Sequence, residues 1–110
     1  MANAIHPISA LGDTTRRTIF ERIREVPSTA GALAAELPVS RPAVSQHLKV
    51  LREAGLVTAD VAGTRRIYRV DPAGLAAIRA WLDQFWDGGL AAFKAEAERI
   101  AKETKEQDDD

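Results

Sequence analysis

Residues 40–57, SRPAVSQHLKVLREAGLV, decide the fold of this chain. Ser40 is a favourable residue for capping the free N–H groups at a helix start, and Pro42 stands in the first turn, where its missing N–H has no consequence. Gly55 is the residue type that ends many helices. Three apolar residues between them recur at i, i+4 and i+7: Val44, Leu48 and Leu51. This spacing predicts an amphipathic helix with one buried stripe.

The polar residues of this helix lie mostly opposite the buried stripe. At about 100° per residue, Gln46 and Lys49 point away from the stripe, Ser45 lies on one flank and His47 at the other edge. Neighbouring residues diverge on a helix, so Ser45, Gln46 and His47 do not make the contact of ~2.6–3.2 Å that a nucleophile and its base need. The sequence predicts a surface that touches a partner rather than one that does chemistry.

The residue types on this surface suit double-stranded DNA. A glutamine can bond an adenine edge, a serine adapts to several bases, and arginine or lysine bonds guanine or phosphate. Arg41 stands in the first turn, where the helix N-terminus also favours phosphate.

The preceding segment predicts two more helices. Asp13 caps the first of them and Pro27 ends it. A short alanine-rich helix follows, capped by Ser28 or Thr29. It stops before Pro38, because proline forces the preceding residue out of the helical region. A turn of about three residues then leads into the quoted stretch, which is the arrangement of a helix-turn-helix.

The following segment, LVTADVAGTRRIYRV at residues 56–70, changes to a strand pattern. It is rich in β-branched residues and has a turn signal in the middle, which predicts a hairpin with strands near 56–61 and 65–70. Arg65 and Arg66 follow the tip directly. Paired arginines there can lie along a DNA backbone or enter a minor groove. Helix, turn, helix and basic hairpin follow the order of a winged helix.

The last element is a long helix that begins at Asp71 and Pro72. Gly88 and Gly89 weaken it by about 1 kcal/mol each relative to alanine, so a bend, a break or close packing is expected there. Its apolar face offers more area than so small a domain covers alone. We therefore predict a dimer interface that includes six residues: Leu75, Ile78, Trp81, Leu82, Phe85 and Trp86. The alternative is that the aromatic residues line a ligand pocket.

Composition bounds the function further. The 110 residues hold no cysteine, which excludes disulfides, cysteine-bound zinc and iron–sulfur clusters. No carboxylate pair, phosphate loop or metal cluster occurs at usable spacing, so we expect neither an enzyme nor a cofactor. An apolar run of about 18 residues and a signal peptide are both missing, so no membrane span and a cytoplasmic location are expected. Residues 1–70 carry a net charge of +4 and residues 71–110 one of −5, and the basic part favours a nucleic-acid partner.

From about Leu11 to Phe93 the sequence resembles the ArsR/SmtB family of bacterial winged-helix repressors. The resemblance rests on LGDTTRRTIFERI, LAAELPVSRPAVSQHLKVLREAGLV and GTRRIYRVDPAGLAAIRAWLDQFW. It implies a homodimer joined by the first and last helices, a palindromic operator, and repression relieved by a signal. The implied DNA contacts lie on the recognition helix and the hairpin: Ser40, Arg41, Ser45, Gln46, His47 and Lys49, with Gly63, Thr64, Arg65 and Arg66.

Family members that sense metals place ligands where this chain has none. One group has cysteines on the helix before the recognition helix, at positions that here hold Thr29, Gly31 and Ala34. Another group uses aspartate and histidine along the last helix, whereas here no histidine follows His47. Soft metals need thiolates or several imidazoles. The sequence therefore resembles the metal-independent branch of the family, and no metal site is expected.

We predict a mainly α-helical (α+β) fold with a small β-hairpin, a winged helix-turn-helix that dimerises through its terminal helices. One domain is expected over residues 1–100, with the helix-turn-helix at 29–54, the wing at 56–70 and the dimer helix at 72–100, followed by a flexible acidic tail at 101–110. The predicted function is that of a dimeric, sequence-specific transcriptional repressor. The alternatives are a winged helix that binds protein, and a regulator that responds to a small apolar ligand at the last helix. The inducer does not follow from the sequence.

Overall fold

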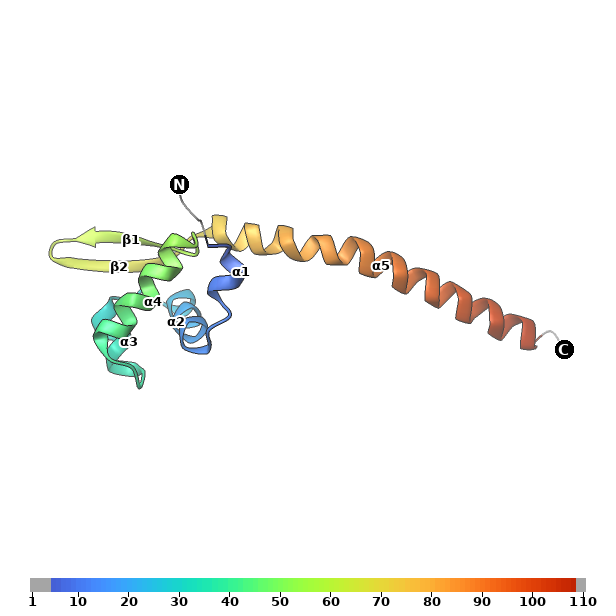
Figure 1. Cartoon of the computed structure of the whole chain (residues 1–110), viewed down its shortest axis with the longest axis horizontal. Helices are drawn as coiled ribbons and strands as arrows, with labels where there is room; N and C mark the ends of the chain where they lie inside the picture. The colour runs from blue at the N-terminus through green and yellow to red at the C-terminus, as the bar shows by residue number, and fades with distance from the viewer. Residues whose placement is uncertain (1–4, 109–110) are drawn as a thin grey trace. The chain divides into compact units, whose positions relative to one another are not determined.

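The computed structural model describes residues 5–108, with the side chains of residues 86–87 and 106–108 outside that description. The chain divides into two compact units, residues 1–78 and residues 79–110. Figure 1 labels the elements in chain order: α1 (Pro7–Ala10), α2 (Thr14–Glu25), α3 (Ala30–Glu36), α4 (Arg41–Glu53), β1 (Val57–Ala62), β2 (Arg65–Val70) and α5 (Pro72–Asp108). This order confirms the predicted mainly helical fold with a two-stranded hairpin.

The predicted helix caps are confirmed. Asp13, Thr29 and Ser40 cap α2, α3 and α4, and each side-chain oxygen accepts a hydrogen bond from the backbone N–H three residues later, at 2.9, 3.1 and 3.3 Å respectively. Each bond satisfies a donor that a helix start otherwise leaves free. The caps therefore fix where α2, α3 and α4 begin, and the last two set the start of each helix of the helix-turn-helix.

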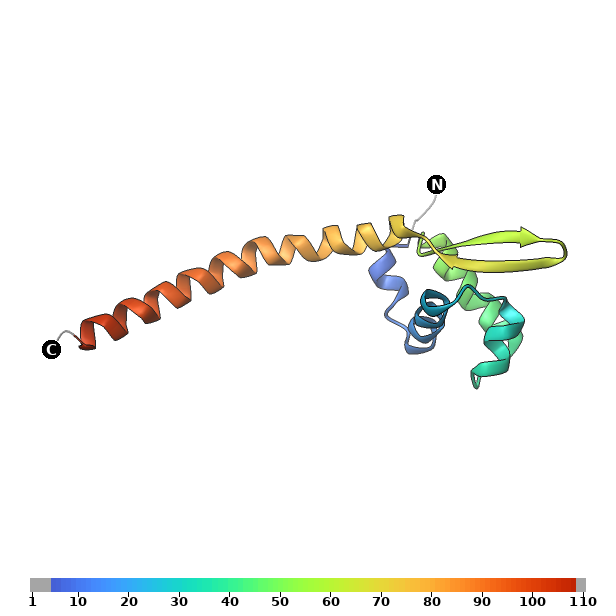
Figure 2. The ribbon, with the colours of Figure 1, turned by 180° about the vertical axis from the view of Figure 1, so that it is seen from behind.

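The core of the first unit lies where α2, α3 and α4 meet the hairpin. β2 contacts α2 and α3, and β1 contacts α4; the view from behind shows the same neighbours (Figure 2). Val44, Leu48 and Leu51 of α4 are fully buried, as predicted. Burying each such side chain contributes about 1.5–3 kcal/mol. The largest other core side chains are Ile19, Phe20, Ile23, Leu33, Leu56 and Tyr68.

The hairpin is antiparallel, with Val57 opposite Val70 at its base and Ala62 opposite Arg65 at its tip. Its root has an additional partner that the sequence did not reveal. Ser28 and Tyr68 exchange two backbone hydrogen bonds, from N to O at 3.2 and 2.9 Å, and form an isolated antiparallel bridge. The loop between α2 and α3 is thereby joined to β2.

The helix α5 is longer and more regular than predicted. It continues through Gly88 and Gly89 without a break and ends at Asp108 rather than near residue 100. Good helix-forming residues fill this part, and Arg99 pairs with Glu96 and Glu103 along one face. Residues 101–108, predicted to fray, are therefore helical, and residues 109–110 lie outside the described residues.

Gly74 allows the start of α5 to pack on the turn that follows α4. A Cβ atom at this position would lie 2.3 Å from the carbonyl oxygen of Gly55, a backbone atom that cannot move aside easily. The backbone N–H of Asp71 donates to the carbonyl of Leu56 at 2.8 Å in the same region. Close approach of two backbones therefore requires glycine at residue 74.

The substitution Gly74→Ala is expected to lower the free energy of unfolding by about 1–3 kcal/mol or more, because the methyl group overlaps the Gly55 carbonyl. Gly88→Ala, on the same helix but with no atom within 4 Å of the added Cβ, is the matched control and should be neutral or stabilising by up to about 1 kcal/mol. Urea denaturation of both variants measures the difference. Equal stability of the two would contradict the proposed close packing.

Candidate nucleic-acid interface

The outward face of α4 carries the polar residues that were predicted to meet DNA. Arg41, Ser45, Gln46 and Lys49 are all exposed, while the opposite stripe of the helix is buried. Ser40 is exposed too, but its hydroxyl is engaged in the cap of α4. The four exposed side chains are free to contact a partner because the core fixes which way the helix faces.

His47 lies on a different side of α4 from Gln46. Its side chain is half-buried, and it lies close enough to Asp13, at the start of α2, for its charge to affect that carboxyl group. The hydrogen bond from the backbone N–H of Arg16 is the main reason that the pKa of Asp13 is lowered, and the charge of His47 adds to it. His47 is thus placed towards α2, and its predicted contact with DNA remains a prediction.

Because the pKa of Asp13 is lowered, the free energy of unfolding should depend on pH in the acid range. A carboxyl group whose pKa is depressed on folding stabilises the folded state above its unfolded pKa, which is close to 3.8, and this stabilisation is lost as the pH falls through the folded pKa. The urea midpoint of the wild type is therefore expected to fall more steeply below about pH 4 than that of Asp13→Asn. Asp83→Asn on α5 controls for the loss of one carboxylate. Parallel pH profiles of the wild type and Asp13→Asn would contradict the prediction.

The hairpin presents its basic residues at and behind the tip. Gly63 has a φ of +66°, which suits glycine at a tight turn. Thr64, Arg65 and Arg66 follow and are exposed. Arg69, further along β2, is held differently, since its Nε lies 2.6 Å from a carboxylate oxygen of Asp60 on β1. The charges near the tip, rather than that of Arg69, are therefore available to a partner.

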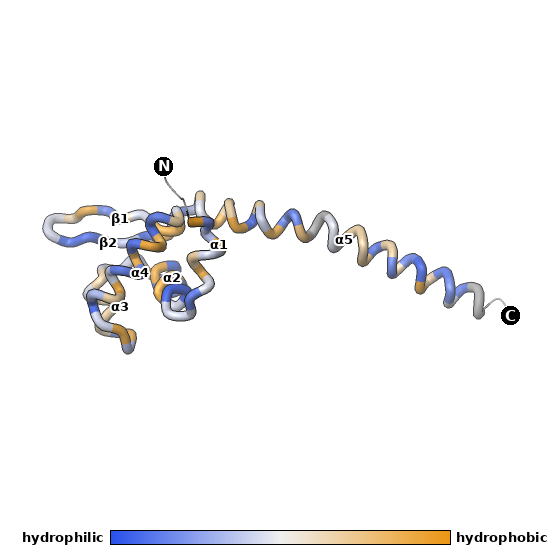
Figure 3. Tube along the Cα trace, viewed as in Figure 1, coloured by the Kyte–Doolittle hydropathy of each residue, from blue (hydrophilic) through white to orange (hydrophobic). Residues whose placement is uncertain are grey.

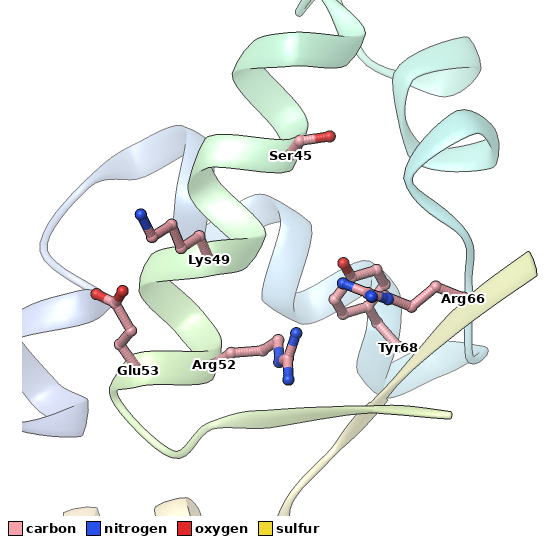
Figure 4. A pocket seen from close by; sticks show the side chains of 6 residues that line it. All are labelled: Ser45, Lys49, Arg52, Glu53, Arg66 and Tyr68. Carbon is pink, nitrogen blue, oxygen red and sulfur yellow. The ribbon is translucent and has the colours of Figure 1, made fainter. Parts of the chain in front are cut away.

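The recognition helix and the hairpin enclose a cleft of about 610 Å³, which we call the α4–β2 cleft. Six residues line it: Ser45, Lys49, Arg52, Glu53, Arg66 and Tyr68. Figure 4 shows Arg52 extending from α4 towards the side of Arg66 and Tyr68, whereas Lys49 and Glu53 lie on the other side of the helix. Arg52 and Tyr68 were not among the residues predicted from the sequence.

A second cleft, of about 620 Å³, lies between the start of α3, the start of α4 and the hairpin. Residues 29–32 form one wall, Arg41 another, and residues 64–66 with Tyr68 a third. The structure therefore brings the predicted residues Arg41, Arg65 and Arg66 to the edges of one concave surface. Gln46 and the half-buried His47 line neither cleft.

Two arginines near the start of α2 have structural partners. The Nε of Arg16 donates to the carbonyl of Ala10 at 2.6 Å, and an Nη of Arg17 donates to the carbonyl of Leu11 at 3.0 Å. These carbonyls lie at the end of α1, where helical partners are missing. The two arginines thus hold α1 against the start of α2.

The helix α5 carries a row of apolar side chains in solvent. Within the described residues, Leu75, Leu82, Phe85, Leu90, Phe93 and Ile100 are all exposed, Phe93 to 72%, and orange segments alternate with blue ones along the helix in Figure 3. Trp81 packs edge-on against Phe85, with ring centroids 4.7 Å apart. Ile78 is partly buried against the core, and the side chain of Trp86 lies outside the described part of the structure. Leu82, Phe85, Gly89, Leu90 and Phe93 form an apolar groove of about 620 Å³.

Side chains that bind metals do not gather at one place in the described residues. Within residues 5–108, no group of three or more His, Cys, Asp or Glu side chains is placed to hold a metal ion. His6 accepts a hydrogen bond from the backbone N–H of Ile8 at 3.1 Å and caps α1. No helix in the described part of the chain is both long and apolar enough to cross a membrane.

The chain is similar to known helix-turn-helix transcriptional regulators in both sequence and structure. A family model described as a helix-turn-helix domain matches residues 11–59. The HTH-type transcriptional regulator Rv2034 of Mycobacterium tuberculosis is 58% identical over 84 residues, which are 76% of this chain and 78% of the relative. The crystal structure of a possible transcriptional regulator for arsenical resistance superposes with a TM-score of 0.70 at 42% identity, over 84% of this chain and 96% of that one.

A further solved structure has the same architecture. It is the homodimeric winged helix-turn-helix DNA-binding domain of Mb0332 from Mycobacterium bovis, a possible ArsR-family regulator. It is 26% identical with a TM-score of 0.60, over 74% of this chain and 75% of that one. The helix-turn-helix, the basic hairpin and these relatives agree, and the chain belongs to the ArsR family of winged helix-turn-helix transcriptional regulators.

Proposed function

We propose that the protein acts as a homodimeric repressor that binds an imperfect palindrome in DNA, with α4 in the major groove and the hairpin on the adjacent backbone. The observation that carries this proposal is that Ser45, Gln46 and Lys49 are exposed on α4 and Arg65 and Arg66 on the hairpin, and that Ser45, Lys49 and Arg66 line one cleft. These residues combine groups that bond base edges with groups that bond phosphate. Thr64 and Arg41, which line the second cleft together with Arg65 and Arg66, extend the same surface.

Dimerisation is proposed to occur along α5. The exposed apolar side chains Leu75, Leu82 and Phe85 support this, because a partner helix would remove them from water at about 25 cal/mol per Å². Ile78, Trp81 and Trp86 belong to the same proposed interface. A twofold dimer would present its two recognition helices about one duplex turn apart, roughly 34–36 Å.

The proposal is tested by selecting bound duplexes from a random pool with the purified protein. We expect an inverted repeat with half-sites separated by one helical turn. The variant Gln46→Ala is expected to lose preference at one base position per half-site while it keeps most of its affinity, because a bidentate contact to a base discriminates by about 1–3 kcal/mol. Failure of the wild type to enrich any sequence, together with no saturable binding at low salt, would refute DNA recognition.

The apolar groove on α5 supports a second candidate, a regulator that responds to a small apolar ligand. Its lining is almost entirely carbon, with Phe85 and Phe93 at its sides. A ligand there would compete with the partner helix, so added apolar compounds would dissociate the dimer and release DNA. Sedimentation with and without such compounds separates this candidate from simple dimer packing. A winged helix that binds protein would instead leave DNA unbound.

A further inference from the structure

The α4–β2 cleft brings two arginines from distant parts of the chain together. Arg52 comes from the last turn of α4 and Arg66 from β2, and both line the same cleft. Figure 4 shows the guanidinium of Arg52 directed across the cleft towards the side that holds Arg66 and Tyr68. Ser45 lies at the upper end of the same side of α4.

Neither arginine has an ionic partner in the described part of the chain. Arg22, Arg69 and Arg99 each lie within 4 Å of a carboxylate, but no such pair involves Arg52 or Arg66. Glu53 lines the cleft, yet its carboxylate is turned to the Lys49 side of the helix. Two like charges that face one cleft without a counter-charge favour the binding of an anion between them.

Tyr68 adds a fixed hydrogen-bond donor. The residue is only 8% exposed, and its backbone is held by the two bonds to Ser28. Within residues 5–108 its hydroxyl group makes no hydrogen bond to another residue, and it borders the cleft. The buried phenol therefore supplies a hydrogen-bond donor next to the two guanidinium groups.

We propose that the α4–β2 cleft of each protomer holds one backbone phosphate of the bound DNA, gripped by Arg52 and Arg66, with the hydroxyl of Tyr68 as an additional donor. A planar guanidinium bonds two phosphate oxygens at once, which suits two arginines that approach from opposite walls. The proposal rests on the proposed function, since the cleft borders Ser45 and the hairpin that are expected to meet DNA. Arg52 is then a determinant of affinity and position, not of base preference.

The first test is the salt dependence of binding by Arg52→Gln. Each neutralised phosphate contributes about 0.9 to the slope of log affinity against log salt, so weaker neutralisation of one phosphate in each protomer should reduce the slope by up to about 2. Affinity should fall about tenfold or more, and by the same factor on the selected operator and on an unrelated duplex. Arg69→Gln is the matched control. It also removes one positive charge, from a residue on the same strand as Arg66, but this residue is paired with Asp60, so the slope should stay nearly unchanged.

Two further variants protect the test against a folding defect. Tyr68→Phe keeps the buried ring and removes only the hydroxyl group; it should weaken DNA binding several-fold with the same thermal midpoint. Arg52→Lys keeps the charge but loses the bidentate geometry, so it should preserve most of the salt slope and still lose affinity. The double variant Arg52→Gln/Arg66→Gln should lose less than the product of the single losses, because both residues act on one phosphate.

Three outcomes separate the possibilities. A wild type that fails to bind DNA refutes the proposed function itself. A wild type that binds, with the same salt slope in Arg52→Gln as in Arg69→Gln, overturns the phosphate site alone. In the third outcome, the wild type binds inorganic phosphate saturably at constant ionic strength, and Arg52→Gln abolishes this binding but leaves the salt slope of DNA binding unchanged. This result would assign the cleft to a free anion and overturn the proposal.

Discussion

The variant Phe85→Glu is expected to be monomeric at micromolar concentration and to bind the operator at least about 100-fold more weakly than the wild type. Phe85 is 60% exposed in the single chain and lies in the apolar groove of α5. In a symmetric dimer the substitution would place two carboxylates in an apolar contact, where an unpaired charge is strongly unfavourable. A monomer engages each half-site separately and so loses the gain of linked binding, which amounts to about 10²–10⁴ in affinity.

Gln84→Glu is the matched control for Phe85→Glu. It introduces the same charge on the neighbouring residue, which lies about 100° away around the helix and does not line the apolar groove. Sedimentation equilibrium should find a dimer for Gln84→Glu and a monomer for Phe85→Glu. The circular dichroism spectra should show that both variants are folded. If the Phe85→Glu protein remained dimeric, α5 would not form the dimer interface.

The double variant Arg65→Ala/Arg66→Ala is expected to lose about 10³-fold in affinity on every DNA sequence. Both side chains are exposed next to the hairpin tip. The dimer would lose four cationic contacts, and roughly 1 kcal/mol for each of them amounts to about three factors of ten. The slope of log affinity against log salt should become shallower by between about 2 and 4, while the sequence preference set by α4 persists.

The control for the hairpin is Arg22→Ala/Arg69→Ala, which removes the same number of charges. Arg22 pairs with Glu36 at 3.1 Å and Arg69 pairs with Asp60. Exposed ion pairs of this kind contribute at most about 1 kcal/mol to stability, so the control should fold normally. If the two double variants bound DNA equally well, with equal salt slopes, the hairpin would not be a wing that contacts DNA.

The features that the sequence predicted well are those determined by nearby residues. The caps at Asp13, Thr29 and Ser40 depend on a bond to a backbone N–H three residues away, and the buried stripe of α4 depends on helical spacing alone. The hairpin follows from its β-branched residues and its glycine turn. The order of these elements, a helix, a turn, a second helix and a basic hairpin, already indicated a winged helix, and the resemblance to a known family agreed with it.

The features that the sequence did not reveal depend on segments that lie far apart along the chain. Arg52 stands on α4 as an ordinary solvated cation until the hairpin brings Arg66 and Tyr68 opposite to it. The bridge between Ser28 and Tyr68 joins residues forty positions apart, and no local pattern indicates it. At Gly88 and Gly89 a bend, a break or close packing was expected, and the helix continues without the break because the flanking residues sustain it.

The bridge between Ser28 and Tyr68 also restricts how the hairpin can swing. Because two backbone bonds anchor β2 at Tyr68, any bending of the hairpin is confined to residues beyond that anchor, towards Arg65 and Arg66. A displacement of the loop between α2 and α3 would therefore be transmitted through these two bonds to β2, the strand that carries both arginines.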